Sequence, residues 1–217
     1  MKENQYIEKE EDYFSHVRMD AIELIPMENR NGNMLEIGAA DGSTLLYCKK
    51  NAYAKNITGV ELCKIEGSLQ ESTEFDAFII GDIESLDLQF SENSFDVILC
   101  LDVLEHLVDP SALLHKVKTF LKDDGVLITS VPNIRELVTM VNIFLRGDFK
   151  YTDSGVLDRT HLRFFCKKNI IELFLDNGFR IVKITDAKNG KRWVVNRLTF
   201  GLFEEFITAQ YYTVLRK

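Results

Sequence analysis

Long apolar runs, paired cysteines and a signal-peptide core are all missing from this sequence. No apolar stretch among the 217 residues approaches the roughly 18 residues of a membrane-spanning helix. The 4 cysteines are scattered without a CxxC pair, so we expect neither a zinc cluster nor a disulfide framework. Because the N-terminus is charged and has no apolar signal core, we expect a cytoplasmic protein without integral membrane association.

Basic residues are in the minority. The sequence has 26 Lys and Arg against 34 Asp and Glu, and its net charge is −8. This balance argues against nucleic acid as a partner held by bulk electrostatics.

Proline is rare, with only 3 residues, and the 12 glycines do not gather into a linker. Segments with a strand pattern instead alternate with amphipathic segments. The expected strands cover 33–38, 57–62, 75–81, 94–102, 126–131, 179–185 and 211–215. The expected helices cover 43–50, 63–70, 110–121 and 167–177, with a turn at 124–125. This alternation predicts an α/β fold, with a Rossmann-like, seven-stranded, mostly parallel sheet and helices on both faces.

Glycine and acidic residues follow the first three expected strands. The turn at 36–42 reads EIGAADG, where glycine permits close approach of a ligand and the next helix offers free N–H groups. Glu61 ends the second strand and suits the two hydroxyls of a ribose. Asp82 and Ile83 end the third strand, where they suit an adenine. Since ligands of parallel sheets bind at these strand ends, we expect a cofactor that contains adenosine.

The first turn discriminates between adenosine cofactors. A dinucleotide site uses G-x-G-x-x-G, whereas this turn reads G-A-A-D-G and carries Asp41, a poor neighbour for a pyrophosphate. Glu36, inside the strand, fits a cationic ligand better than an anionic one. S-adenosylmethionine has a sulfonium and an amino group and no phosphate, so it is favoured over a nicotinamide cofactor.

The order of these motifs resembles that of class I S-adenosylmethionine-dependent methyltransferases. The resemblance covers residues 32–186 and extends to VLEHLVDP at 103–110 and DRTHLRFF at 158–165. These last two stretches are similar to those of small-molecule and polysaccharide-associated methyltransferases. The sequence has Ala40 where that family usually has the middle glycine, and we expect the alanine to be tolerated at a negative φ. The resemblance divides the chain into an N-terminal helical segment (1–31), a methyltransferase core (32–186) and a C-terminal extension that completes the sheet (187–217).

The resemblance also implies a cofactor site along successive strand ends. Its members would be Glu36, Gly38, Ala39, Ala40, Asp41, Gly42, Glu61, Leu62, Asp82, Ile83, Leu101, Asp102 and Val103. Glu36 would orient the turn and lie near the methionine amino group, and Gly38 with the backbone of residues 39–42 would face the methionyl part. Glu61 would bind the ribose, residues 82–83 the adenine, and residues 101–103 would border the sulfonium. Other interpretations remain open: Glu61 as a solvated strand end, Asp82 as a helix N-cap, and Asp102 as a structural residue.

Two histidines are candidate general bases for a hydroxyl acceptor. His106 lies just past the fourth strand and is the first choice, and His161, in the DRTHLRFF stretch, is the second. Each has a structural alternative, as a turn or loop histidine. His16 and His115 lie on expected helices, and we assign them no role. We expect no metal, because the Asp…Asp-Asn ligand set of catechol-type enzymes is missing.

The substrate region is expected within an insertion at 132–160, which is long for a connection and suggests a lid. Its apolar stretch at 137–145 is read as a lid helix, a homodimer face, a lipid-facing patch or plain core. Basic residues are in excess across 135–168, so Arg159 and Arg163 are candidates for binding an anionic acceptor such as a nucleotide- or lipid-linked sugar. A helix around 13–18 is a further candidate for closing over the cofactor.

The sequence therefore predicts an S-adenosylmethionine-dependent methyltransferase acting on a small-molecule or carbohydrate hydroxyl. A nucleic-acid methyltransferase is disfavoured, because the fourth strand ends in CLDVLEH without an Asn/Asp-Pro-Pro-aromatic turn and no Pro-Cys nucleophile is present. The alternatives are a non-catalytic S-adenosylmethionine-binding module of a surface-polysaccharide pathway and, less favoured, a nicotinamide-dependent oxidoreductase.

Overall fold

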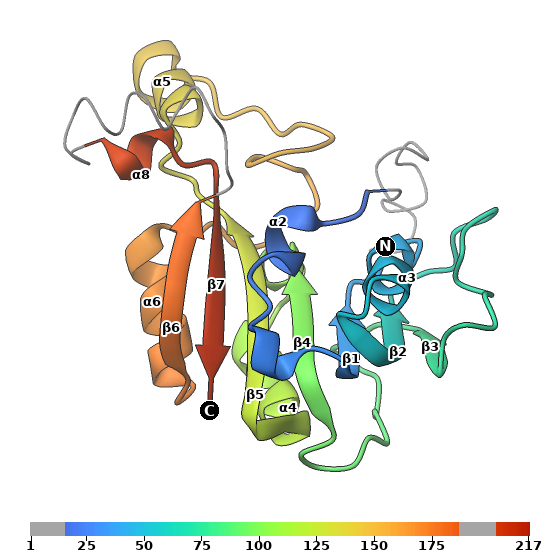
Figure 1. Ribbon diagram of the computed structural model, residues 1–217. Helices are drawn as coiled ribbons and strands as arrows, with labels where there is room; N and C mark the ends of the chain where they lie inside the picture. Colours follow the sequence, from blue (N-terminus) through green and yellow to red (C-terminus); the bar gives the residue numbers. More distant parts are fainter. Residues whose placement is uncertain (1–15, 187–202) are drawn as a thin grey trace.

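A single seven-stranded sheet forms the centre of the molecule (Figure 1). The computed structural model describes residues 16–186 and 203–217. The strands are β1 (Gly32–Ile37), β2 (Ala54–Glu61), β3 (Ala77–Ile80), β4 (Phe95–Leu101), β5 (Leu121–Pro132), β6 (Arg180–Asp186) and β7 (Gln210–Arg216). Their order is β3-β2-β1-β4-β5-β7-β6; β1 to β5 pair in parallel, and β7 is antiparallel to both of its neighbours. The predicted fold class is confirmed.

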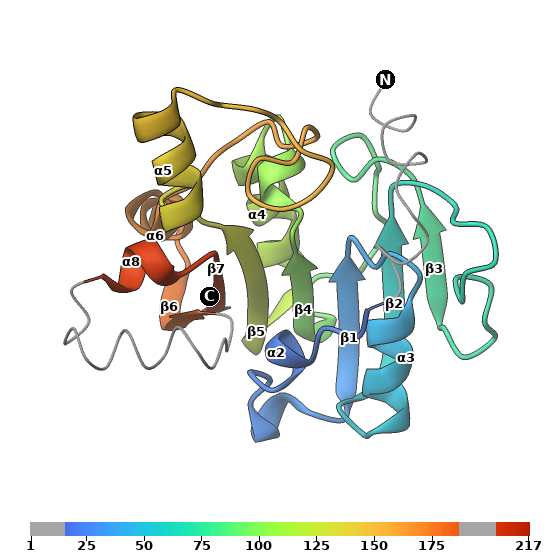
Figure 2. The same ribbon diagram turned by 90° about the horizontal axis from the view of Figure 1, so that it is seen from above.

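Helices cover both faces of this sheet (Figure 2). One face packs against α2 (Met19–Ile22) and α3 (Ser43–Lys50), and the other against α4 (Pro110–Phe120) and α6 (Lys167–Asp176). Alternate strand residues serve the two faces: Met34 belongs to the α2/α3 side of the core and Leu35 to the α4/α6 side. The α4 helix begins after Asp109, whose Oδ1 accepts hydrogen bonds from the Ser111 and Ala112 amides.

The order of the strands reverses beside β1, which pairs with β2 on one side and with β4 on the other. Chain connections therefore leave β1 and β4 in opposite directions. In an open α/β sheet this switch point opens a crevice beyond the carboxyl ends of the strands.

Two sequence expectations about local structure are wrong. Residues 63–70 form turns rather than a helix; Gly67 has a φ of 73°, and the Gln70 side chain bonds the Ile65 amide and the Ala40 carbonyl instead of continuing helical bonds. The expected turn at 124–125 lies inside β5, which begins at Leu121. The pairing of β5 with β4 shifts register at this end of the strand.

The expected insertion contains α5 (Leu137–Arg146), which lies beyond the carboxyl ends of the strands together with the loop that follows it (Figure 1). The core interpretation of this helix is wrong: only Thr139 is buried, and Phe144 and Leu145 are more than two-thirds exposed. Three further short helices lie within the described residues: η2 (Met27–Asn29), η3 (Leu104–His106) and α8 (Glu204–Ile207).

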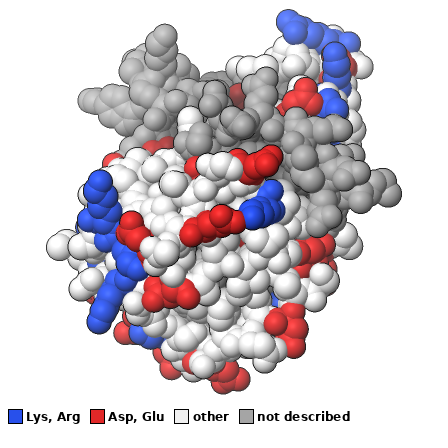
Figure 3. All heavy atoms as spheres, turned by 90° about the vertical axis from the view of Figure 1, so that its right-hand side faces the viewer, with Lys and Arg blue, Asp and Glu red and all other residues white. Residues whose placement is uncertain are grey.

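The two ends of the chain are described in part. Residues 1–15, with Tyr13 and Phe14 of the expected closing helix, and residues 187–202 lie outside the described residues. None of the described helices has the length and apolarity needed to cross a membrane. The face toward the β3 edge carries interspersed acidic and basic side chains (Figure 3).

Candidate active site

A cavity of about 590 Å³ opens at the carboxyl ends of β1, β2 and β4, at the switch point. Its walls come from segments far apart in the sequence: the segment before α2, the turn after β1, the ends of β2 and β4, the loop at 155–162, and the start of β7. Such a volume accommodates a small-molecule ligand.

The turn after β1 is held in a conformation that side chains rarely adopt. Gly38 has a φ of 74°, and a Cβ there would lie 2.6 Å from Val103 Cγ2, so only glycine fits. Ala40 has a φ of 48°, which corrects the expectation of a negative value. Its amide donates to Glu61 Oε2 at 2.7 Å and its carbonyl accepts from Gln70 Nε2 at 2.8 Å. These two bonds maintain the left-handed backbone despite the Cβ.

Glu36 presents a buried carboxyl group at the base of the cavity. Its side chain is 2% exposed, and Oε2 has no hydrogen-bond partner among the described residues. Burial raises the pKa of Glu36 to about 8, although the nearby Arg18 guanidinium acts to lower it. An unpaired buried carboxyl of this kind is well suited to an incoming cationic group.

Glu61 is also buried, but it is hydrogen-bonded. Its two oxygens accept from the Ala40 and Leu62 amides, both at 2.7 Å. Burial raises the pKa of Glu61, and the backbone donors act against this. Each oxygen retains a second lone pair, which can accept from a hydroxyl. At the end of β3, Asp82 lines the cavity, and its Oδ1 accepts a hydrogen bond from the Glu84 amide at 3.0 Å. This bond caps a turn at 83–85 and not a helix, so the alternative interpretation as a helix N-cap is wrong.

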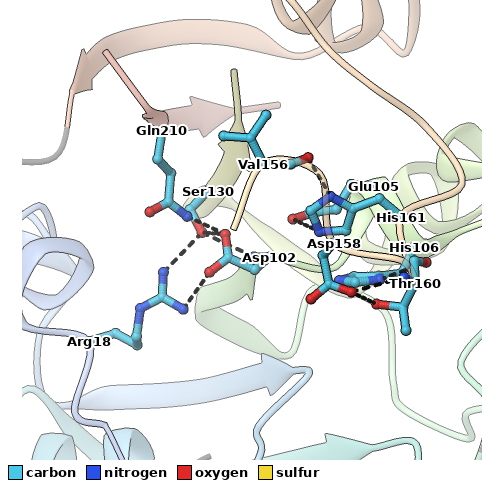
Figure 4. Close-up of polar contacts among 10 residues, drawn as sticks. All are labelled: Arg18, Asp102, Glu105, His106, Ser130, Val156, Asp158, Thr160, His161 and Gln210. Carbon is cyan, nitrogen blue, oxygen red and sulfur yellow. Dashed lines mark hydrogen bonds and ion pairs between the residues drawn. The ribbon is translucent and has the colours of Figure 1, made fainter. Parts of the chain in front are cut away.

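Asp102, directly after β4, is the centre of a polar network (Figure 4). Its Oδ2 lies 2.7 Å from Arg18 Nη1, and its Oδ1 accepts from the Ser130 hydroxyl at 2.8 Å and from Gln210 Nε2. Asp102 has a φ of 55°, a strained value for a residue with a side chain. Burial lowers the pKa of Arg18, but Asp102 and Tyr212 more than offset this and raise it overall.

A second polar cluster lies on the other side of the cavity (Figure 4). The rings of His106 and His161 meet edge to face, with centroids 4.7 Å apart. Each Nδ1 faces a backbone carbonyl oxygen at 3.1 Å, that of Thr160 for His106 and that of Val156 for His161. Glu105 is 1% exposed beside them, and burial raises its pKa well above the ordinary value.

The two basic candidates for acceptor binding differ in position. Arg159 lines the cavity and pairs with Asp153 at 2.5 Å. Arg163 does not line it, contrary to the sequence expectation, because its guanidinium bonds the carbonyl oxygens of Leu107 and Val108. It thereby fastens the 155–163 loop to the segment after η3.

Comparison with known proteins identifies the family. The sequence model described as "Methyltransferase domain" matches residues 8–184, well over half of the chain. This chain belongs to that methyltransferase family. S-adenosylmethionine is its methyl donor, and the methyltransferase has groups that fit this molecule: the unpartnered Glu36 oxygen for a cation and the Gly38 turn for close approach.

Solved structures of other proteins share this fold at low sequence identity, and one curated sequence is similar over most of the chain. A SAM-dependent methyltransferase from Thermotoga maritima is 17% identical, with a TM-score of 0.65 and full coverage of both chains. One from Archaeoglobus fulgidus is 20% identical, with a TM-score of 0.64 over 95% of this chain and 97% of that one. An uncharacterized protein from Methanocaldococcus jannaschii is 25% identical over 77% of this chain and 69% of its own length.

The methyltransferase brings nearly all the sequence-predicted residues to one cavity. The exceptions are Arg163 and Gly42, which do not line the cavity. Gly42 is the N-cap residue of α3 and has a φ of 86°. Sequence reasoning missed Gln210 and Tyr212, assigned no role to His16, and named Arg18 only within the segment around 13–18 that was expected to close over the cofactor; all four residues line the cavity. It also assigned no role to Glu105, although the VLEH stretch was singled out. An acidic residue between apolar neighbours and a histidine was the signal that could have found it.

Proposed function

We propose that the methyltransferase transfers a methyl group to a hydroxyl oxygen of a small-molecule or carbohydrate acceptor. One observation carries this proposal: a single cavity joins the Glu36 turn to the two imidazole rings of His106 and His161. The first end suits a cationic methyl donor, and the second supplies groups able to take a hydroxyl proton.

The residues around the first end have distinct proposed roles. Glu36 Oε2 accepts from the donor's amino group, and the Gly38 backbone lies against its methionyl chain. Glu61 accepts from the ribose hydroxyls with the lone pairs that its backbone bonds leave over. Asp82 and Ile83 bind the adenine ring, with Leu62 on the same wall. All of these residues line the cavity, which supports the assignments.

Asp102 is proposed to border the reacting centre together with Leu101 and Val103, because all three line the cavity directly after β4. Its ion pair with Arg18 and its bond from Ser130 fix the carboxylate while leaving it part-exposed. A fixed negative charge there favours the cationic donor in the ground state. Alignment of donor and acceptor then supplies much of the rate acceleration.

The chemistry requires one proton acceptor from the chain. S-adenosylmethionine supplies an activated methyl group, whose carbon–sulfur bond breaks with its electron pair going to sulfur as the new carbon–oxygen bond forms. His106 Nε2 accepts the hydroxyl proton, since its Nδ1 is already directed at the Thr160 carbonyl. His161, which is 8% exposed, orients His106 through the ring contact.

Arg159 supports an anionic acceptor, such as a nucleotide- or lipid-linked sugar. It lines the cavity on the histidine side, and about half of its side chain remains exposed despite the ion pair with Asp153. A phosphate on the acceptor can displace Asp153 and form a bidentate pair with the guanidinium. The exposed α5 helix adjoins this region beyond the strand ends (Figure 1).

The test is a methyl-transfer assay with isotopically labelled S-adenosylmethionine and a panel of nucleotide sugars, phenols and amines. The proposal predicts label on a hydroxyl oxygen of one acceptor. It also predicts that His106→Gln lowers kcat by about 10²-fold or more with unchanged donor affinity. The matched control is His115→Gln, on the exposed face of α4, which should leave both unchanged. Label found only on amine nitrogen would contradict the proposal.

A further inference from the structure

Three potential metal ligands converge beside the acceptor end of the cavity. They are Glu105 and His106 of η3, and His161 of the 147–166 loop. One ligand atom from each residue lies within 4.8 Å of the other two. The three side chains come from two segments that lie more than 50 residues apart in the sequence. Figure 4 shows the rings of His106 and His161 next to each other, with the Glu105 carboxylate facing the ring of His161.

Glu105 is the unusual member of this cluster. Its side chain is 1% exposed, and neither carboxylate oxygen has a hydrogen-bond partner among the residues that the structure describes. Oε1 lies 3.9 Å from His161 Nε2, which is too long for a hydrogen bond. Burying an ionised carboxylate without hydrogen-bond donors costs several kcal/mol of desolvation free energy unless a cation compensates for the charge. Without a cation, a carboxyl in this position is protonated, and a metal ion between Glu105 and the rings can take the place of that proton.

The two histidines are oriented as metal ligands are. Because a carbonyl oxygen only accepts hydrogen bonds, the contacts to Thr160 and Val156 place the ring proton on Nδ1 of each neutral histidine. The lone pair is then on Nε2. A backbone carbonyl behind Nδ1 is a frequent outer partner of a metal-bound histidine, where it fixes the ring and raises its basicity.

The backbone also joins the two segments that supply the ligands. The amides of Leu162 and Arg163 donate to the Glu105 carbonyl oxygen, at 2.8 and 3.0 Å. Arg163 adds two bonds from its guanidinium to the carbonyls of Leu107 and Val108. His161 is therefore held against η3 without any metal, and Arg163 acts as a positioning residue for the site.

We propose that Glu105, His106 and His161 bind a divalent first-row transition-metal ion at the acceptor end of the cavity. Ligand atoms bonded at about 2.1 Å lie roughly 3.0–3.4 Å apart, so the three side chains need to close in by about an ångström. Two imidazoles and one carboxylate favour Mn²⁺, Fe²⁺, Co²⁺ or Zn²⁺ over Mg²⁺, which prefers oxygen ligands. Three protein ligands leave coordination positions open toward the cavity.

The role of the ion rests on the proposed function and deepens it. An acceptor hydroxyl bound at an open position has a lowered pKa. With the ion bound, His106 Nε2 is a metal ligand, and water takes over the proton-accepting role that His106 has in the metal-free step. The oxygen then takes the methyl carbon while the carbon–sulfur electron pair remains on sulfur, as in the metal-free step. Acceptors with two adjacent oxygens, such as a vicinal diol of a sugar, fit such a site best because both oxygens can bind.

The first experiment measures binding alone. Protein stripped with a chelator is titrated with Co²⁺, Mn²⁺, Zn²⁺ and Mg²⁺, with calorimetry for each and absorption spectroscopy for Co²⁺. The proposal predicts one equivalent of the transition metals, visible Co²⁺ bands from nitrogen ligation, and binding of Mg²⁺ that is weaker by at least about 10-fold. Failure of all three transition metals to bind the folded wild-type protein would overturn it.

The second experiment assigns the ligands. Glu105→Gln and His161→Asn should each weaken Co²⁺ binding on the order of 10²-fold. His115→Asn is the matched control and should bind Co²⁺ as the wild type does. Donor affinity, measured on the same samples, reports whether each variant is folded. Equal Co²⁺ affinity in the wild type and both ligand variants would contradict the assignment.

A third comparison separates this inference from the proposed function. Turnover should stop on chelation and return with Mn²⁺ or Co²⁺ but not Mg²⁺. Hydroxyl methylation that continues unchanged in chelator would overturn the metal role and leave the proposed function standing. Stoichiometric metal binding without methylation of any hydroxyl acceptor would contradict the proposed function and leave the metal site standing.

Discussion

Arg18 Nη1 lies 2.7 Å from Asp102 Oδ2, and this ion pair ties the segment before α2 to the end of β4. The same guanidinium lies 3.3 Å from the Ser130 and Tyr212 hydroxyls, so it spans β4, β5 and β7. His16, two residues earlier, lines the cavity as well. Arg18 therefore fixes the position at which the N-terminal segment crosses the cofactor cavity.

Arg18→Gln is expected to weaken S-adenosylmethionine binding by about 10-fold, equivalent to about 1.4 kcal/mol, because the cavity loses the anchor of one wall. It should also lower the free energy of unfolding by about 1–2 kcal/mol. The control is Lys122→Gln, which removes the 2.8 Å ion pair to Asp96 at the opposite end of β4. That variant should lose some stability and bind the donor normally. Unchanged donor affinity in Arg18→Gln would contradict the anchoring role.

Ala40→Gly should stabilise the fold by about 0.5–1 kcal/mol, since Ala40 has a φ of 48° and glycine adopts this conformation without strain. Chemical denaturation of both proteins measures the difference. Ala39→Gly is the neighbouring control: Ala39 is buried and does not have a positive φ, so its replacement should destabilise by a similar amount. A loss of stability in Ala40→Gly would show that the turn adopts a different conformation.

Glu36 makes stability depend on pH. Its pKa rises from 4.5 in the unfolded chain to about 8 in the folded protein, so the folded state binds the proton more tightly. This contribution is fully present below pH 4.5, declines as the pH rises, and is lost above about 8. Glu36→Gln should remove it, and the difference in unfolding free energy between the two proteins should follow this window. A difference that is independent of pH between 5 and 9, roughly, would contradict the shifted pKa.

Arg159→Ala and Arg163→Ala should separate acceptor binding from loop anchoring. Arg159→Ala is expected to raise the acceptor KM by about 10-fold with unchanged donor affinity, since it faces the cavity. Arg163→Ala is expected to lower the thermal stability and reduce kcat, because it releases the loop that carries His161. Steady-state kinetics and thermal melts distinguish the two outcomes. The reverse pattern would reassign the acceptor contact to Arg163.

Much of the sheet and of the cofactor cavity could be predicted from the sequence. The strand pattern is local, and parallel strands bring their carboxyl ends to one edge, so Glu36, Glu61 and Asp82 converge once the topology is known. Ala40 was predicted at the wrong φ because its conformation depends on Gln70 and Glu61, which reach it from other segments.

The rest of the site depends on distant pairing. Gln210 reaches Asp102 across 108 residues because β7 inserts antiparallel between β5 and β6. No local pattern around Gln210 or Arg18 indicates this meeting. The prediction that Arg163 binds the acceptor was wrong, because its guanidinium donates hydrogen bonds to two backbone carbonyl oxygens. An excess of basic residues in a segment does not indicate which of them will make such bonds.

The methyl-donor site is tested most directly by calorimetric titration of the wild type and Glu61→Gln with S-adenosylmethionine, S-adenosylhomocysteine and NAD. We predict micromolar binding of both sulfur ligands, no binding of NAD, and a loss of at least about 10-fold in affinity for Glu61→Gln. Binding of NAD, or sulfur ligands that bind equally well to the variant, would contradict the cavity at the β1–β4 switch point as the methyl-donor site.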